Sequence, residues 1–114
     1  MAPYRSFRND TPRSMGQRVS MIRKLESWYV DQCDGDWEHG LGITIESLDN
    51  PGWMLRINIE ATSLDQSGFD WVKIERSDLD WVFYRSTGRL FEAACGPQNL
   101  EEAIRLFLDF AGHD

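Results

Sequence analysis

The sequence predicts an α+β fold: an N-terminal helix, then an antiparallel sheet of about five strands, then a C-terminal helix packed on one face of that sheet. Two patterns of apolar residues carry this prediction. Near both ends of the chain they recur at spacings of three and four, as on one face of a helix, and between these segments they alternate with polar residues, as on a half-buried strand. The 114 residues are close to the commonest domain size, so we expect one core.

The N-terminal helical pattern runs from about Ser14 to Gln32. One face carries apolar residues at helical spacing, namely Met15, Val19, Ile22, Leu25 and Trp28. Gly16 weakens the first turn, which moves the expected start towards Ser20. The segment 34–36, Asp-Gly-Asp, is typical of a turn and ends the helix.

Strand signals follow. Ile43 and Ile45 alternate with polar residues, and residues 53–59 show the clearest alternation in the chain. Between them, Asp-Asn-Pro-Gly at 49–52 fits a type II turn with Gly52 at a central position, so we expect an antiparallel hairpin. Three weaker strands are predicted around Val72 and Ile74, from Trp81 to Tyr84, and from Leu90 to Ala94.

The last element is a helix that begins after Asn99. Asn is a good N-cap residue, and Glu102 stands three positions later, in a first turn where the helix dipole favours negative charge. Gly112 ends the helix. Its apolar stripe consists of Leu100, Ala103, Ile104, Phe107, Leu108 and Ala111.

The charge is unevenly distributed. Residues 1–24 carry six basic residues and one acid, and a total of −7 minus this +5 leaves −12 for residues 25–114. We expect residues 1–19 to be a flexible basic extension and residues 20–114 to be a single domain. An acidic body repels nucleic-acid phosphates and attracts a basic partner, although acidity also serves solubility.

The cellular setting is predicted from absences in the sequence. No apolar run approaches the roughly 18 residues that span a bilayer, and the N-terminus has no apolar segment of a secretory signal. The two cysteines form no CxxC motif and no disulfide framework. We therefore expect a cytoplasmic protein that binds neither membrane nor nucleic acid.

The densest polar cluster is the segment 33–39, whose candidate binding residues are Asp34, Asp36, Trp37, Glu38 and His39. The alternating acids resemble a calcium loop. However, the sixth and twelfth positions counted from Asp34 are His and Ile, where an EF-hand needs Gly and Glu. There is also no phosphate-binding glycine motif, so we expect no metal and no cofactor.

Thiol chemistry is the alternative that the sequence leaves open. Cys33 or Cys95, with His39 as a base, would form a nucleophile pair, as in a small thiol enzyme such as a sulfurtransferase. Cys95 precedes the N-terminus of the last helix, which would lower its pKa. A buried, inert Cys95 is the other interpretation, and the one we favour.

The tryptophans divide into core and surface candidates. Trp28 and Trp53 lie on apolar stripes and are expected in the core. Trp71 lies on the polar side of its strand, and Trp37 lies among acids. An exposed Trp beside acids is typical of a binding hot spot, so both are candidate interface anchors.

Several strings together resemble the immunity protein 53 family. They are Trp28-Tyr29, the run Gln-Cys-Asp-Gly-Asp-Trp-Glu-His at 32–39, Gly42, and Leu-Asp-Asn-Pro-Gly-Trp at 48–53. A looser similarity continues through Asp80-Trp81, Cys95-Gly96-Pro97 and Asn99-Leu100, so that it spans about residues 20–112.

This resemblance implies a bacterial polymorphic-toxin system, in which the immunity protein binds and neutralises a toxin encoded by the neighbouring gene. It implies a binding protein and not an enzyme. Since many such toxins are nucleases with basic active sites, we expect a partner with a basic surface, contacted by Asp34, Asp36 and Glu38 with Trp37 as an anchor. The alternative is that this segment builds the fold, with its acids capping backbone amides and Trp37 in the core.

Overall fold

The structure is a computed structural model that describes residues 20–40 and 42–112. It confirms the α+β fold with an N-terminal helix, an antiparallel sheet and a C-terminal helix packed against it. The predicted extension at residues 1–19 lies outside the described residues. The elements are α1 (Met21–Gln32), α2 (Trp37–Gly40), β1 (Ile43–Leu48), β2 (Gly52–Asn58), β3 (Gly68–Ser77), β4 (Asp80–Thr87), β5 (Leu90–Cys95) and α3 (Leu100–Ala111).

Helix α1 begins at the position that the weak first turn indicated. Ser20 is its N-cap, and the Ser20 hydroxyl accepts a hydrogen bond from the backbone N–H of Arg23 at 3.1 Å. Leu25 and Trp28 are its buried residues, whereas Ile22 is 49% exposed. Of the predicted apolar stripe, Leu25 and Trp28 are therefore buried and Ile22 is not, and Met15 and Val19 lie outside the described residues.

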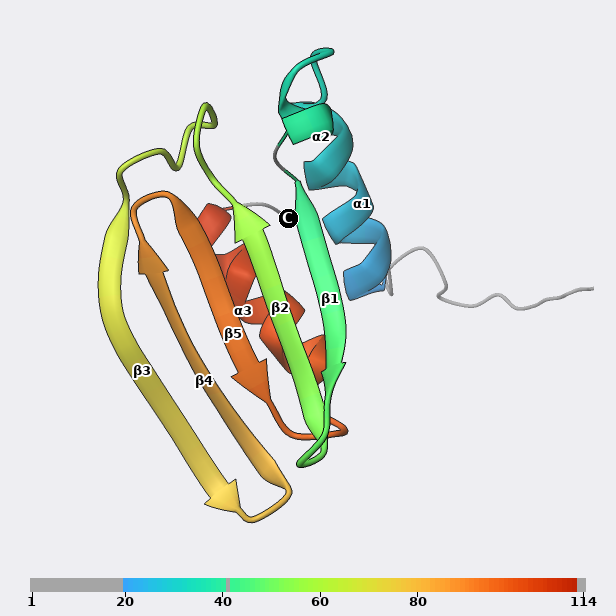
Figure 1. The fold of residues 1–114 in the computed structure, drawn as a ribbon, viewed down its shortest axis with the longest axis vertical. Helices are drawn as coiled ribbons and strands as arrows, with labels where there is room; N and C mark the ends of the chain where they lie inside the picture. Colours follow the sequence, from blue (N-terminus) through green and yellow to red (C-terminus); the bar gives the residue numbers. More distant parts are fainter. Residues whose placement is uncertain (1–19, 41, 113–114) are drawn as a thin grey trace, which may run out of the picture.

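The five strands form one antiparallel sheet in the order β1-β2-β5-β4-β3 (Figure 1). The β1–β2 hairpin is confirmed, with Ile43 opposite Ile57 and Leu48 opposite Gly52. The connection 59–67 carries the chain across one end of the sheet to its far edge. Consequently β5, which comes last, lies between β2 and β4.

Gly52 has a different role from the one expected. It is the first residue of β2, and not a central residue of the turn. A Cβ atom there would collide with the backbone carbonyl oxygen of Cys95 on β5. The glycine is thus required by the close approach of two strands.

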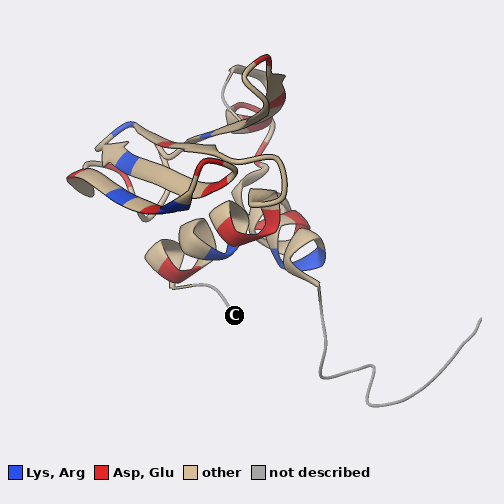
Figure 2. Ribbon diagram, turned by 90° about the horizontal axis from the view of Figure 1, so that it is seen from below, with Lys and Arg blue, Asp and Glu red and all other residues tan. Residues whose placement is uncertain are grey.

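One face of the sheet packs against α3 and forms the core. Burial alternates along β2 and β5, as a sheet with one covered face requires. α3 contacts β2, β4 and β5, and α1 packs mainly on α3. Figure 2 shows α3 running beneath the sheet. The fully buried large side chains are Leu55, Ile57, Ile59, Val82, Phe91, Ile104 and Phe107.

A series of aromatic rings connects the helices to the sheet. The centroid of the Phe107 ring on α3 lies 4.8 Å from that of Trp28 on α1 and 5.1 Å from that of Phe91 on β5. Both pairs are edge to face. Trp28 in turn contacts Trp37, with 5.7 Å between ring centroids. Edge-to-face pairs are a favoured geometry for aromatic rings, so this series fixes where α1 stands relative to the sheet.

Replacing Phe107 by Ala tests this arrangement. Phe107 is fully buried, so we expect the variant to lose about 3–5 kcal/mol of unfolding free energy, because it loses buried apolar contact and leaves a cavity. Urea denaturation followed by tryptophan fluorescence measures the loss. Val30→Ala, at a side chain that is 65% exposed, is the control and should change stability by no more than about 0.5 kcal/mol. A loss below about 1 kcal/mol for Phe107→Ala would contradict the assigned role.

Candidate functional site

The acidic loop, here defined as residues 33–40 and including α2, is held by its own carboxylates. Asp34 Oδ1 accepts hydrogen bonds from the backbone N–H groups of Asp36 at 2.9 Å and Trp37 at 3.0 Å. Glu38 accepts from the N–H groups of Asp34 at 2.9 Å and Gly35 at 2.8 Å. The reciprocal pattern resembles a capping box with the second acid four positions on instead of three, and it satisfies backbone amides just before and at the start of α2.

The backbone amides also set the ionisation of these two acids. The pKa of Asp34 is lowered, chiefly by the hydrogen bonds from Trp37 and Asp36. The pKa of Glu38 is lowered by its own backbone N–H, by those of Asp34 and Gly35, and by the charge of His39. Hydrogen bonds to the charged form favour that form, so both side chains are carboxylates at neutral pH.

The sequence left open whether Trp37 is an exposed interface anchor or a core residue. Its side chain is 2% exposed and packs against Trp28 and Tyr29, with ring centroids 5.7 and 5.5 Å apart. Its indole N–H has no hydrogen-bond partner among the described residues, so packing holds it in place. Trp37 is therefore a core residue of the free protein and presents no exposed anchor.

The remaining candidates do not form one continuous site. Asp34, Asp36 and His39 are exposed on the acidic loop, and Glu38 is half-buried. Trp71 is 39% exposed and lies on β3, the edge strand farthest from β1, into which the acidic loop leads (Figure 1). The guanidinium carbon of Arg85 lies 4.7 Å from the Trp71 ring centroid, a cation–π contact. Trp71 thus belongs to a different surface from the loop.

Trp28 and Trp53, which were both expected in the core, are buried to different degrees. Trp28 is 4% exposed and belongs to the core, as predicted. Trp53 is only half-buried. Its indole N–H donates a hydrogen bond to the carbonyl oxygen of Pro97 at 3.0 Å, which ties the start of β2 to the segment before α3.

Within residues 20–40 and 42–112, no group of three or more His, Cys, Asp or Glu side chains is placed to hold a metal ion. In the same part of the chain, no helix has the length and apolar character needed to cross a bilayer.

The two thiols lie in contrasting environments. Cys95 is fully buried, and burial raises the pKa of its thiol to about 11. The expectation that a helix N-terminus would lower this pKa is wrong, because desolvation of the thiolate is the larger effect. Cys33 is exposed, and its Sγ donates a hydrogen bond to the carbonyl oxygen of Tyr29 at 3.3 Å. Neither sulfur is hydrogen-bonded to His39 in the described structure, so no nucleophile–base pair is assembled there.

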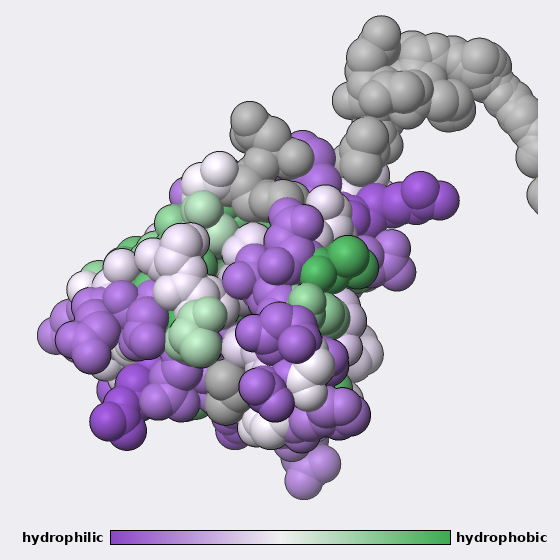
Figure 3. Space-filling model, turned by 90° about the horizontal axis from the view of Figure 1, so that it is seen from above, coloured by the Kyte–Doolittle hydropathy of each residue, from purple (hydrophilic) through white to green (hydrophobic). Residues whose placement is uncertain are grey.

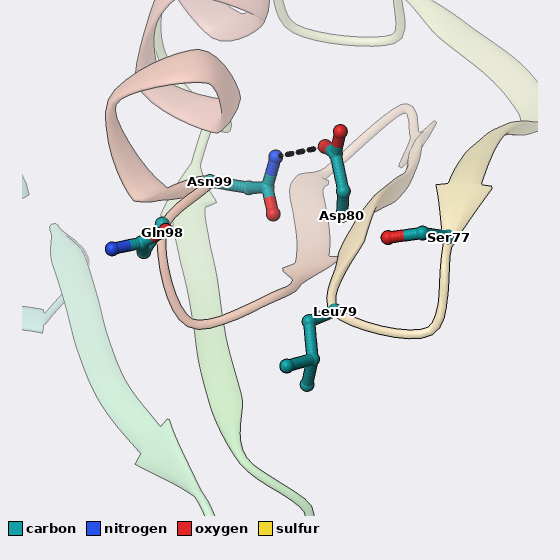
Figure 4. A pocket seen from close by; sticks show the side chains of 5 residues that line it. All are labelled: Ser77, Leu79, Asp80, Gln98 and Asn99. Atoms are coloured by element: carbon teal, nitrogen blue, oxygen red, sulfur yellow. Dashed lines mark hydrogen bonds between the residues drawn. The ribbon is translucent and has the colours of Figure 1, made fainter.

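A polar hollow at the opposite end of the sheet was not predicted. Its volume is about 410 Å³, and Asn99 and Asp80, which both line it, point towards each other (Figure 4). The Asn99 amide nitrogen donates to Asp80 at 2.9 Å and to Glu102 at 3.1 Å. Arg76 bridges Asp80 at 2.9 Å and Glu102 at 2.5 Å. The hydrogen bonds from Arg76 are the main cause of the lowered pKa values of Asp80 and Glu102.

This network corrects the role predicted for Asn99. It occupies the N-cap position of α3, but its side chain makes no capping hydrogen bond. The side-chain oxygen instead faces the backbone N–H of Trp81 at 3.4 Å. Asn99 therefore joins α3 to the β3–β4 hairpin. The signal available in the sequence was that Asp80-Trp81 and Asn99 both occur in the strings that carry the family resemblance.

The carboxylates of the acidic loop predict a specific pH dependence. Their pKa values are depressed from the ordinary values of 3.8 and 4.5, so their contribution to stability is present above the ordinary values and is lost as pH falls through the folded-state values. The double variant Asp34→Asn/Glu38→Gln should be less stable than the wild type at neutral pH and should lose less stability on acidification. Thermal denaturation from about pH 7 to about pH 3 measures this difference.

Asp36→Asn is the matched control for that experiment, because no hydrogen bond to the Asp36 carboxylate is present among the described residues. Its melting temperature should follow the wild-type pH curve. If the double variant also runs parallel to the wild type over the whole pH range, the two carboxylates do not stabilise the loop as described.

Thiol accessibility predicts a second result. In the folded protein Cys33 should react rapidly with an aromatic disulfide reagent, whereas Cys95 should react only after denaturation, since it is buried and protonated at neutral pH. Spectrophotometric titration with and without urea distinguishes the two. Cys33→Ser should leave the folded protein unreactive, and Cys95→Ala should retain the fast thiol. A fast reaction in Cys33→Ser would contradict the burial of Cys95.

Comparison with known proteins gives one match. The family model described as Immunity protein 53 matches residues 22–112, which is most of the chain. No curated protein and no solved structure matches the chain significantly. The matched range includes the acidic loop, all five strands and both long helices except the first residue of α1. The chain therefore belongs to the immunity protein 53 family.

Proposed function

We propose that this protein binds a cognate toxin of a bacterial polymorphic-toxin system and neutralises it inside the producing cell. The observation that carries the proposal is the family match over residues 22–112. Membership of an immunity protein family points to a non-enzymatic role. The burial of Cys95 and the absence of a Cys–His pair in the described structure agree with that role.

The charge of the domain supports a basic partner. Acidic residues outnumber basic ones along the described chain, and the whole chain carries −7 (Figure 2). A negative surface repels nucleic acid and anionic membranes, and it accelerates association with a positively charged protein. We therefore infer a cytoplasmic protein whose partner is a toxin with a basic surface.

We further propose that the acidic loop is one of the toxin contacts, through Asp34, Asp36, Glu38 and His39. The hydrogen bonds from backbone amides hold Asp34 and Glu38 in place before any partner arrives. A contact surface that is rigid in advance loses less conformational entropy on binding. The end of the molecule that carries this loop is mostly hydrophilic, with apolar residues in small separate patches (Figure 3). The loop thus offers charge more than apolar area.

Growth rescue tests the function. The toxin domain encoded by the neighbouring gene should arrest growth when it is expressed alone, and co-expression of this protein should restore growth. The two purified proteins, with the toxin domain catalytically inactivated, should form a complex of defined stoichiometry by size-exclusion chromatography. Absence of both rescue and complex formation would overturn the proposed function.

Charge reversal at Asp36 tests the loop. Asp36→Lys is chosen because Asp34 and Glu38 also build the loop, so that their replacement would confuse folding with binding. We expect about a tenfold loss of affinity for the inactivated toxin domain, mainly as a slower association rate that depends less on salt. Glu26→Lys makes the same change of charge on an exposed position of α1 and should have a smaller effect. Equal effects of the two variants would remove the loop from the contact surface.

A further inference from the structure

The second face of the sheet is uncovered in the described structure. In Figure 1 this face is turned towards the reader, with α3 behind the strands and α1 and α2 beside β1. The strand registers place alternate residues of each strand on it. We call it the open face; its residues include Thr44, Glu46, Met54, Arg56, Trp71, Lys73, Glu75, Trp81, Phe83, Arg85, Glu92 and Ala94.

Apolar side chains gather in one part of the open face. Phe83 on β4 lies opposite Ala94 on β5, and Ala94 lies opposite Met54 on β2. The Trp81 ring lies next along β4, with its centroid 5.2 Å from that of Phe83. We call these four residues the apolar floor. Each is partly exposed, although side chains on the solvent face of an antiparallel sheet are normally polar. An uncovered apolar patch that extends over three adjacent strands is typical of an interaction site.

The basic side chains around the floor already have partners. Arg85 bonds to Glu92 at 2.8 Å and stacks on Trp71, and Arg56 is paired with Glu46. The Lys73 ammonium lies 5.7 Å from the centroid of the Phe83 ring. The two arginines are therefore neutralised by carboxylates, whereas Lys73 keeps its charge and has no carboxylate partner among the described residues.

The acids at the same end of the sheet remain available. Glu75 on β3 lies opposite Trp81 on β4. Asp49 lies in the β1–β2 turn and Asp78 in the β3–β4 turn, both at the lower end of the sheet in Figure 1. None of the three forms an ion pair within residues 20–40 and 42–112. The charge presented beside the floor is therefore negative.

We propose that the apolar floor of the open face, together with the acids beside it, is the surface that holds the toxin. The complementary partner surface is an apolar or aromatic protrusion flanked by lysine or arginine, since it would fill the floor and meet the acids beside it. An aromatic centre surrounded by fixed polar pairs is the usual composition of a binding hot spot and its rim. This inference rests on the proposed function and names the surface that performs it.

A second copy of the chain fits this surface poorly. In a two-fold dimer the same patch meets itself, so that two floors in contact would bring together two sets of Glu75, Asp49 and Asp78. Like charges placed close together oppose association. A basic partner turns the same acids into favourable contacts.

The two proposed contacts have separable effects on kinetics. Charges at the acidic loop act over a distance and change the rate of association. Side chains buried in the floor act after docking and change the rate of dissociation. The loop and the floor can therefore be tested independently on the same complex.

Ala94→Arg is the sharpest test, because it places a long cationic side chain in the middle of the floor without removing any core residue. Surface plasmon resonance with the inactivated toxin domain of the neighbouring gene should show affinity reduced by about 100-fold or more, mainly through faster dissociation. Thr44→Arg introduces the same side chain on the same face outside the floor, and should change affinity less than about threefold.

Trp81→Ala and Met54→Lys provide independent variants if Ala94→Arg fails to fold, which circular dichroism and thermal denaturation detect. At least one folded floor variant should lose about tenfold or more in affinity. If all folded floor variants bind as tightly as the wild type, the proposal is overturned while the proposed function stands. If the wild type itself neither binds nor protects, both fail. If sedimentation shows a wild-type dimer that Ala94→Arg dissociates, the floor is a self-association surface and the proposal is overturned.

Discussion

The packing of Phe107 between Trp28 and Phe91 is the contact on which the rest of the structure depends. It joins three elements at one ring: α1 through Trp28, α3 through Phe107 itself, and the sheet through Phe91. Helix α1 packs mainly on α3, so it is held to the sheet largely through this contact. Trp37 extends the series to the acidic loop. The position of the loop is thus fixed by aromatic packing in the core.

Covering only one face of the sheet has a direct consequence for function. Helix α3 buries the side that carries Phe91 and Ala93, and the described structure has no further element to cover the other side. Most of that side is made compatible with water by ion pairs such as Arg85–Glu92. The apolar floor is the exception. Its apolar side chains are partly exposed to water, so a partner that buried them would gain hydrophobic stabilisation.

The acidic loop holds two like charges close together through hydrogen bonds from its backbone amides. Asp34 and Glu38 lie within one short segment and would repel each other in an open chain. Each instead accepts two hydrogen bonds from backbone amides, which favour the ionised forms. The same bonds shape the chain so that Trp37 turns inward while Asp36 stays at the surface. Folding and the presentation of charge therefore have a common cause here.

The sequence by itself determined the local features of the protein: the helix start at Ser20, the β1–β2 hairpin, the helical stripe of α3 and the acidic character of the loop. Each of these depends on residues close together in the chain, whose spacing and capping preferences are visible in the sequence. The tertiary structure decided the insertion of β5 between β2 and β4, the inward position of Trp37, and the contact of Asn99 with Asp80. Alternating apolar residues show that a strand has a buried face but do not specify its neighbours, and the burial of a side chain depends on what distant segments place against it.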